Sequence, residues 1–222
     1  MQLIPLQIRD GHLFVQIEDG LFLLDTGAPS SFASCAALTI AGRRFSLGGS
    51  YMGLTPETLS SFVGVQTAGL LGADVLGEFD VMIDALSSSV TFSTDELHFD
   101  GEVVPLDAFM GIPIISTLIG TASYRMFFDT GAQISYLQDK SLSIYPSAGP
   151  VTDFYPGVGQ FQTETHTFSV RVGTIPFEVR CGSLPGLLGM TLMMAGTQGI
   201  LGNQILHGRR VGYFPRRKIL VL

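Results

Sequence analysis

Two short carboxylate-bearing motifs stand out in the sequence. The tripeptide Asp-Thr-Gly occurs in FLLDTGAPSSF (22–32) and again in MFFDTGAQISYL (126–137), each time directly after an apolar run. Their ionisable residues are Asp25 and Asp129. Two carboxyl groups about 3 Å apart share one proton, because both do not readily ionise together. Such a pair can act as a base toward water and as an acid toward a leaving nitrogen, which indicates hydrolytic acid–base chemistry.

A second repeated segment follows each Asp-Thr-Gly motif. GLLGADVLGEFDVMIDALSSSVTF (69–92) aligns without a gap with GILGNQILHGRRVGYFPRRKILVL (199–222). An apolar hairpin pattern precedes each motif, and Asp19-Gly20 is a typical turn dipeptide in the first of these hairpins. The chain is therefore predicted to contain two copies of one unit, each of which supplies one carboxylate.

The elements expected to position these motifs are mainly strands. The chain has 27 Gly and 16 Phe, and neither half shows a long amphipathic helical period. Short helices are expected at TPETLSSF (55–62) and PGLLGMTLMMA (185–195). We predict a mainly all-β fold of two pseudo-symmetric, barrel-like lobes. The N-terminal lobe is expected at 1–104 and the C-terminal lobe at 105–222.

The second half contains a segment that the first half lacks. A local match between TIAGRRFSL (39–47) and RVGTIPFEV (171–179) places the extra residues between about 138 and 168. Their pattern of strand, Gly-rich tip and strand predicts a protruding hairpin at about 148–168. The tip of this hairpin would hold Phe154, Tyr155, Pro156, Gly157, Val158 and Gly159.

The repeated motifs resemble those of the aspartic proteases, and the resemblance covers nearly the whole chain. The sequence DTGA at 25–28 and 129–132 resembles the retropepsin form, whereas two unlike halves in one chain resemble pepsin. The segments Leu70-Leu71-Gly72 and Ile200-Leu201-Gly202 resemble the hydrophobic-hydrophobic-Gly motif of this family, and the first is flanked as in bacterial retropepsin-like domains. The resemblance implies a pepsin/retropepsin-like fold that hydrolyses polypeptides through a pair of aspartates.

The other residues of the two motifs are expected to support the catalytic loops. They are Thr26, Gly27, Ala28, Thr130, Gly131 and Ala132. The glycines permit a tight turn, and by resemblance the threonine hydroxyls bond to the backbone of the opposite loop. The alanines stand where pepsin-like enzymes carry Ser or Thr, so no hydroxyl there lowers the pKa of the carboxyl groups, and a milder acidic optimum is expected.

The extra hairpin is the candidate flap, the segment that covers bound substrate in this family. A single flap on the C-terminal lobe would be an inverted arrangement, since pepsin-like enzymes carry it on the N-terminal lobe and retropepsins carry one on each subunit. Tyr155 resembles the flap tyrosine of pepsin, and 157–159 resembles the glycine tip of retropepsins; the sequence leaves both readings open. The rival candidate flap is LGGSYMGL (47–54), with Tyr51.

Composition argues against several classes of partner. The net charge of −7 disfavours nucleic acid, and the basic residues at 209–218 are expected to form a solvated edge hairpin. The four His are scattered and no nucleotide-binding loop is present, so neither a metal nor another cofactor is expected. The longest apolar stretch (109–120) is too short to span a membrane. Cys35 is expected in the core, and a disulfide between Cys35 and Cys181 stays open.

Three further expectations concern the whole protein. No signal-peptide pattern is visible, so we expect a cytoplasmic protein, with a periplasmic or secreted location open if a leader was removed. Because both halves lie in one chain, a monomer is expected. The alternative to an enzyme is a catalytically inactive binding or assembly module on the same fold.

Asp74, Asp80 and Asp84 have no acidic counterparts in the second half and are expected to be solvated charges.

Overall fold

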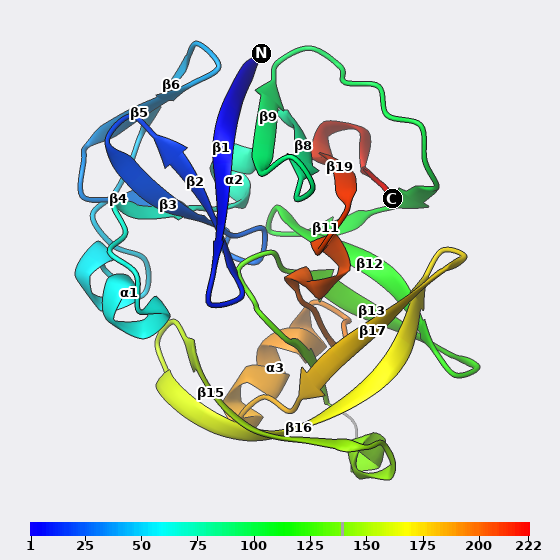
Figure 1. Ribbon diagram of the computed structural model, residues 1–222. Helices are drawn as coiled ribbons and strands as arrows, with labels where there is room; N and C mark the ends of the chain where they lie inside the picture. Colours follow the sequence, from blue (N-terminus) through cyan, green and yellow to red (C-terminus); the bar gives the residue numbers. More distant parts are fainter. Residues whose placement is uncertain (139) are drawn as a thin grey trace.

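The fold is described from a computed structural model, which covers residues 1–138 and 140–222 (Figure 1). The first half consists mainly of short strands with two short helices. Its elements are β1 (Gln2–Arg9), β2 (His12–Ile17), β3 (Gly20–Leu24), β4 (Phe32–Ala33), β5 (Ala37–Ile40), β6 (Arg43–Ser46), α1 (Pro56–Val63), β7 (Gly69–Leu71), α2 (Ala73–Leu76), β8 (Asp80–Asp84) and β9 (Ser89–Ser93).

The second half repeats this order with longer strands. Its elements are β10 (Val103–Pro105), β11 (Asp107–Phe109), β12 (Ile112–Ile119), β13 (Ala122–Phe128), β14 (Ser135–Leu137), the 3-10 helix η1 (Lys140–Ile144), β15 (Ser147–Tyr155), β16 (Gly159–Val172), β17 (Ile175–Gly182), α3 (Gly186–Met194), β18 (Gly199–Leu201), η2 (Asn203–Leu206), β19 (Arg210–Phe214), η3 (Pro215–Arg217) and β20 (Ile219–Val221). The mainly β fold predicted from the sequence is confirmed.

Three sheets hold these strands. A ten-stranded sheet has the order β10-β20-β19-β8-β9-β1-β2-β3-β7-β4, an eight-stranded sheet has the order β11-β12-β13-β18-β14-β17-β16-β15, and β5 pairs with β6. An additional pairing between β12 and β16 closes the second sheet into a barrel-like ring. The last hairpin, β19–β20, belongs to the first sheet, so the sheets do not divide where the sequence changes from one half to the other.

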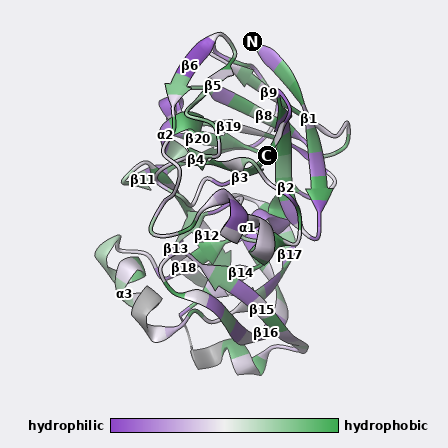
Figure 2. Cartoon of the chain, turned by 90° about the vertical axis from the view of Figure 1, so that its left-hand side faces the viewer, coloured by the Kyte–Doolittle hydropathy of each residue, from purple (hydrophilic) through white to green (hydrophobic). Residues whose placement is uncertain are grey.

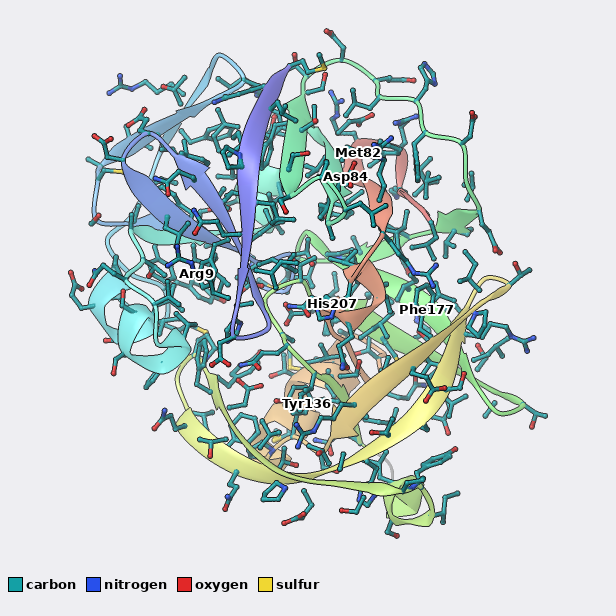
Figure 3. All side chains as sticks on the ribbon, in the orientation of Figure 1. Arg9, Met82, Asp84, Tyr136, Phe177 and His207 are labelled. Atoms are coloured by element: carbon teal, nitrogen blue, oxygen red, sulfur yellow. The ribbon has the colours of Figure 1, made fainter. Side chains whose placement is uncertain are left out.

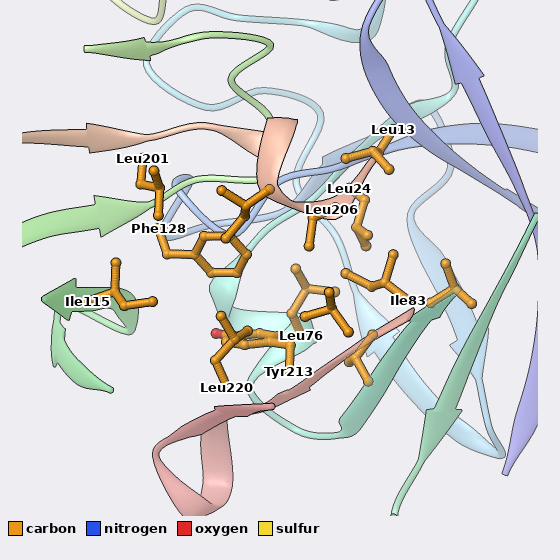
Figure 4. Close-up of a cluster of buried hydrophobic side chains, with 14 of the residues drawn as sticks. Leu13, Leu24, Leu76, Ile83, Ile115, Phe128, Leu201, Leu206, Tyr213 and Leu220 are labelled. Atoms are coloured by element: carbon orange, nitrogen blue, oxygen red, sulfur yellow. The ribbon is translucent and has the colours of Figure 1, made fainter. Parts of the chain in front are cut away.

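The two halves meet where β8 pairs with β19, which occupy equivalent positions in the sequence repeat. Ile83 lies opposite Val211 in this antiparallel ladder. Behind it, one hydrophobic core contains side chains of both halves, including Leu24, Phe128 and Tyr213 (Figure 4). The halves therefore share a core and a sheet as well as a cleft.

Turn chemistry explains several boundaries. The β1–β2 turn places Asp10 and Gly11 at φ values of 47° and 77°, the left-handed region that glycine adopts without strain. The turn expected at Asp19-Gly20 begins one residue earlier, because Ile17 already pairs with Gly20. Helix α1 begins after Thr55, whose hydroxyl accepts from the N–H of Thr58 as an N-cap.

Two expectations about charged residues are wrong. Asp80 is completely buried and accepts hydrogen bonds from the guanidinium groups of Arg216 and Arg217. Asp84 is also buried and pairs with Arg210 at 2.7 Å, and it is labelled in Figure 3. These two carboxylates of the first half pair with arginines of the second half across the shared sheet. This pairing explains why the second half has no acidic residues at the positions equivalent to Asp80 and Asp84.

The hydropathy pattern fits this arrangement, with hydrophobic residues along the inner strands and a hydrophilic stretch on β6 (Figure 2).

Both cysteines are free thiols, and Cys35 is exposed, contrary to the expectation that it packs in the core. Within residues 1–138 and 140–222, no helix is long and apolar enough to cross a membrane.

Candidate active site

Each Asp-Thr-Gly motif lies in a loop between two strands that are separated by a third. The first loop joins β3 to β4, and β7 passes between them, parallel to β3 and antiparallel to β4. The second loop joins β13 to β14 around β18 in the same way. The N–H of Asp25 donates to the carbonyl of Leu71, and that of Asp129 to Leu201, both at 3.0 Å. The apolar-apolar-Gly strands thus anchor the carboxyl-bearing residues from behind.

The two loops bring Asp25 and Asp129 together. The two carboxyl groups are hydrogen-bonded to each other. A Cβ at Gly27 would overlap the carboxyl of Asp129, and one at Gly131 would overlap the carboxyl of Asp25. Each glycine is therefore required by the close approach of the opposite carboxyl group.

Backbone amides hold one oxygen of each carboxyl group in place. Oδ1 of Asp25 accepts from the N–H of Gly27 and of Ala28, both at 2.9 Å. Oδ1 of Asp129 accepts in the same way from the second loop, at 2.9 and 3.2 Å. The alanine at the fourth position of each motif supplies its backbone donor, and its side chain has no hydroxyl to add a further one.

The threonines bind the two loops to each other. Thr26 donates its hydroxyl to the carbonyl of Phe128 at 2.6 Å, and Thr130 donates to Leu24 at 2.7 Å. Each hydroxyl also accepts from the backbone N–H of the other threonine at 3.0 Å. Both threonines are completely buried. This geometry is the cross-loop bonding that the family resemblance implies.

The electrostatics of the pair favour a shared proton. Burial raises the pKa of Asp25 well above its usual range, and the neighbouring Asp129 raises it further. Burial also raises the pKa of Asp129, which the hydrogen bond from Asp25 opposes. The pair titrates as a unit. It therefore retains one proton at a pH where an exposed aspartate is ionised.

A cavity of about 340 Å³ lies over the pair and is lined by both halves. The first half contributes Leu23, Asp25, Gly27, Ala28, Tyr51 and Met52. The second half contributes Asp129, Gly131, Ala132, Phe154, Tyr155, Gly157 and Val158, among others. Most of the lining side chains are apolar, and the two carboxyl groups lie at the junction. Thr26, Thr130 and Gly159 are not among the lining residues.

The extra hairpin reaches across the cleft from the second half to the first. Its strands are β15 and β16, with Pro156, Gly157 and Val158 at the turn. The ring of Phe154 lies 4.9 Å from that of Phe62 on α1, and the hairpin tip beside α1 is visible in Figure 1. The hairpin thus forms part of the wall of the cavity.

The rival flap segment lines the same cavity from the opposite side. Tyr51 and Leu54 exchange backbone hydrogen bonds of 3.0 and 2.9 Å around a two-residue turn. Tyr51 and Met52 line the cavity, and a Cβ at Gly157 would lie 3.3 Å from Cε of Met52. The two candidates are therefore not alternatives, because a short turn and a long hairpin meet over one cleft.

Sequence reasoning missed a buried histidine that is hydrogen-bonded to the second Asp-Thr-Gly loop. Nδ1 of His12 donates to the carbonyl of Gly131 at 3.1 Å, and Nε2 accepts from the amide of Gln133 at 2.8 Å. Burial lowers the pKa of His12, which fits a neutral ring with one donor and one acceptor. The buried amide of Asn203 bonds to Gly11 at 2.8 Å on the same turn.

This brace exists on one side only. The positions equivalent to His12, Gln133 and Asn203 in the other half are Ile112, Pro29 and Ala73, none of which has a side-chain donor. In the sequence, the presence of these three polar side chains in one copy of the repeat and not in the other was the signal that could have revealed this hydrogen-bond network. Among the residues that the structure describes, no group of His, Cys, Asp and Glu could hold a metal ion.

Comparisons with known proteins concern the fold. No protein-family model matches the chain, and no curated protein matches it. Among solved structures, the chain is similar to the crystal structure of basic 7S globulin from soybean, with a TM-score of 0.51 and 11% identity over 98% of this chain and 93% of that one. At this identity the likeness shows the fold alone. The chain has a mainly β, two-lobed, pepsin-like fold.

Proposed function

We propose that this protein is an aspartic endopeptidase, which hydrolyses peptide bonds with a water activated between Asp25 and Asp129. The observation that carries the proposal is the convergence of these two carboxyl groups, hydrogen-bonded to each other, in one apolar cleft. Their raised pKa values give the pair one proton to share, as acid–base catalysis on an amide requires.

The reaction needs no covalent intermediate. The ionised carboxylate takes a proton from water as the water oxygen attacks the carbonyl carbon, while the protonated carboxyl group gives its proton to the carbonyl oxygen. The tetrahedral diol then collapses and the C–N bond breaks. The carboxyl group that received the proton from water passes it to the leaving nitrogen, and one diol hydroxyl returns its proton to the other, now ionised, carboxylate as the product carboxyl group forms. The carboxyl groups exchange roles without net consumption of protons, which is why both halves must contribute.

The enclosure of the cleft suits a polypeptide in an extended conformation. The hairpin β15–β16 and the turn at Tyr51 lie over the carboxyl pair, so substrate would be held between them and the loops and shielded from water. Because both aspartates belong to one chain, a monomer would suffice for activity, and we propose that the protein acts as one.

A digestion experiment tests the proposal. Denatured casein is incubated with the protein between about pH 3 and about pH 7, with and without a statine-type transition-state inhibitor. The variants Asp25→Asn and Asp129→Asn are assayed beside the wild type. Cleavage that the inhibitor blocks and that either substitution abolishes supports the enzyme. Tight binding of the inhibitor without cleavage at any pH favours the inactive binding module instead.

A further inference from the structure

A third carboxylate lines the cleft and has no part in the proposed reaction. Asp153, on β15, borders the same cavity as Asp25 and Asp129 and is partly exposed to it. Its negative charge helps to raise the pKa of Asp129 and opposes the lowering of the pKa of His12 by burial. The carboxylate therefore lies in the same cleft as the pair of aspartates, where a bound substrate side chain can reach it.

Two hydrogen bonds fix the orientation of this carboxylate. Its Oδ2 accepts from the hydroxyl of Tyr136, and its Oδ1 accepts from the N–H of Phe154 at 2.7 Å. Tyr136 is buried, and burial raises the pKa of its hydroxyl, which the charge of Asp153 raises further. The hydroxyl consequently stays protonated and donates. Figure 3 labels Tyr136 among the side chains of the second half.

Asp153 lacks a cationic partner. Asp80, Asp84 and Asp107 each pair with an arginine, but none of the ion pairs in the described part of the chain includes Asp153. Carboxylates in enclosed surroundings are usually paired, because removal from water without a counter-charge is unfavourable. A cation from outside the chain would supply the missing charge.

The surroundings of Asp153 are apolar. Phe161 lies opposite it in the β15–β16 ladder, and the rings of Phe161 and Tyr136 are 6.1 Å apart. Leu184 and Leu192 line the cavity and belong to the same hydrophobic cluster as Tyr136 and Phe161. Apolar walls with one oriented carboxylate match a side chain that has a long aliphatic stem and a positive end.

We infer that Asp153 is a specificity-determining residue that selects a lysine or arginine side chain on one side of the scissile bond. The inference rests on the proposed peptidase function and refines its substrate class. A purely apolar cleft would instead favour aliphatic or aromatic side chains at both positions next to that bond.

Matched peptides test the inference. Quenched fluorescent peptides carry lysine or norleucine, and in a second pair arginine or citrulline, at either position flanking the scissile bond. Wild type is compared with Asp153→Asn, which keeps the size and an acceptor for Tyr136 but removes the charge. Glu164→Gln is the matched control, because Glu164 is an exposed acid on the same hairpin, outside the cavity lining.

At one flanking position, wild type should cleave the cationic peptide with a kcat/KM about tenfold or more above its neutral partner, as expected for a charge-assisted hydrogen bond. Asp153→Asn should lose this preference, read as the ratio of the two kcat/KM values measured within each protein, and Glu164→Gln should keep it. Equal cleavage of both partners by wild type, or a preference that survives in Asp153→Asn, would overturn the inference.

Binding of the same peptides with a reduced, uncleavable bond separates this inference from the proposed function. Fluorescence anisotropy gives their dissociation constants for wild type and Asp153→Asn. Tighter binding of the cationic analogue that depends on Asp153, without any cleavage, would support the inference about the cleft and overturn the peptidase. Cleavage without a preference for the cationic peptide would support the peptidase and overturn the inference about Asp153. Absence of both binding and cleavage would overturn the peptidase and the inference together.

Discussion

Thr26 and Thr130 exchange hydrogen bonds across the boundary between the two halves, the N–H of each donating to the hydroxyl of the other at 3.0 Å. Each hydroxyl in turn donates to a carbonyl of the strand that leads into the opposite loop. Four bonds therefore join two loops that are far apart in the sequence. The relative position of the two carboxyl groups depends on this small buried network.

The network predicts a difference between two substitutions of Thr26. Thr26→Val keeps the shape but leaves the buried carbonyl of Phe128 and N–H of Thr130 without partners, which should lower the free energy of unfolding by about 2–5 kcal/mol. Thr26→Ser keeps the hydroxyl and should lose less. Urea unfolding of the three proteins checks this. Equal stabilities for the valine and serine variants would show that the hydroxyl is not what joins the loops.

A second prediction concerns the alanine that follows the first Asp-Thr-Gly. In Ala28→Ser the new hydroxyl can donate to Asp25, whose Oδ1 already accepts from the N–H of residue 28. A hydrogen bond of about 1 kcal/mol to the ionised form lowers an apparent pKa by about 0.7 unit. The acidic limb of the pH profile of kcat/KM should move by about that amount to lower pH. An unchanged profile in the serine variant would argue against this role of the alanine.

The two Asp-Thr-Gly loops could be predicted from the sequence because each motif is local. A repeated DTGA, each copy followed by an apolar-apolar-Gly strand, specifies two equivalent loops. A pair of carboxyl groups follows if the two halves fold alike. The extra hairpin was also predictable, since it is an insertion in one copy of a repeat, and β15 and the adjoining part of β16 fall within the expected range.

Long-range partners could not be predicted in this way. In the sequence, Asp80 has the pattern of a solvated charge in a hairpin. In the structure, the shared sheet places Arg216 and Arg217 beside it as ion-pair partners. Contact of Phe154 with Phe62 likewise depends on how far the hairpin bends across the cleft. Both relationships join segments from different halves, for which a single sequence contains no pairing information.

His12 predicts a pH dependence of stability. Its pKa is lowered in the folded protein, so on acidification the unfolded chain takes up a proton that the folded chain does not. The contribution of His12 to stability should therefore decrease as the pH falls below the ordinary histidine value of about 6.5 toward the pKa of folded His12.

The variant His12→Gln removes the titrating group and keeps a donor and an acceptor. Its free energy of unfolding relative to that of wild type should rise as the pH is lowered from about 8 to about 5. Urea unfolding on either side of the histidine pKa measures this difference. A constant difference between the two proteins across this range would show that His12 does not titrate differently on folding.

The contact between Phe62 and Phe154 predicts how firmly the hairpin closes. Removing one ring in Phe62→Ala should cost about 0.5–1.5 kcal/mol of closure, a two- to tenfold change in the open population. Hydrogen exchange of the amides near the tip of β15–β16 should accelerate accordingly, and KM should rise. Amides of β8, distant from the contact, serve as the internal control. Unchanged exchange at the tip would indicate that other contacts hold the hairpin closed.

Whether Asp25 and Asp129 of one chain form one active site is tested by the cleavage rate of denatured casein by Asp25→Asn, by Asp129→Asn and by their equimolar mixture. We expect wild type to cleave casein and neither variant nor the mixture to do so. A variant that retains the wild-type rate would contradict a shared site within one chain, as would a mixture that recovers activity by combining intact motifs from two chains.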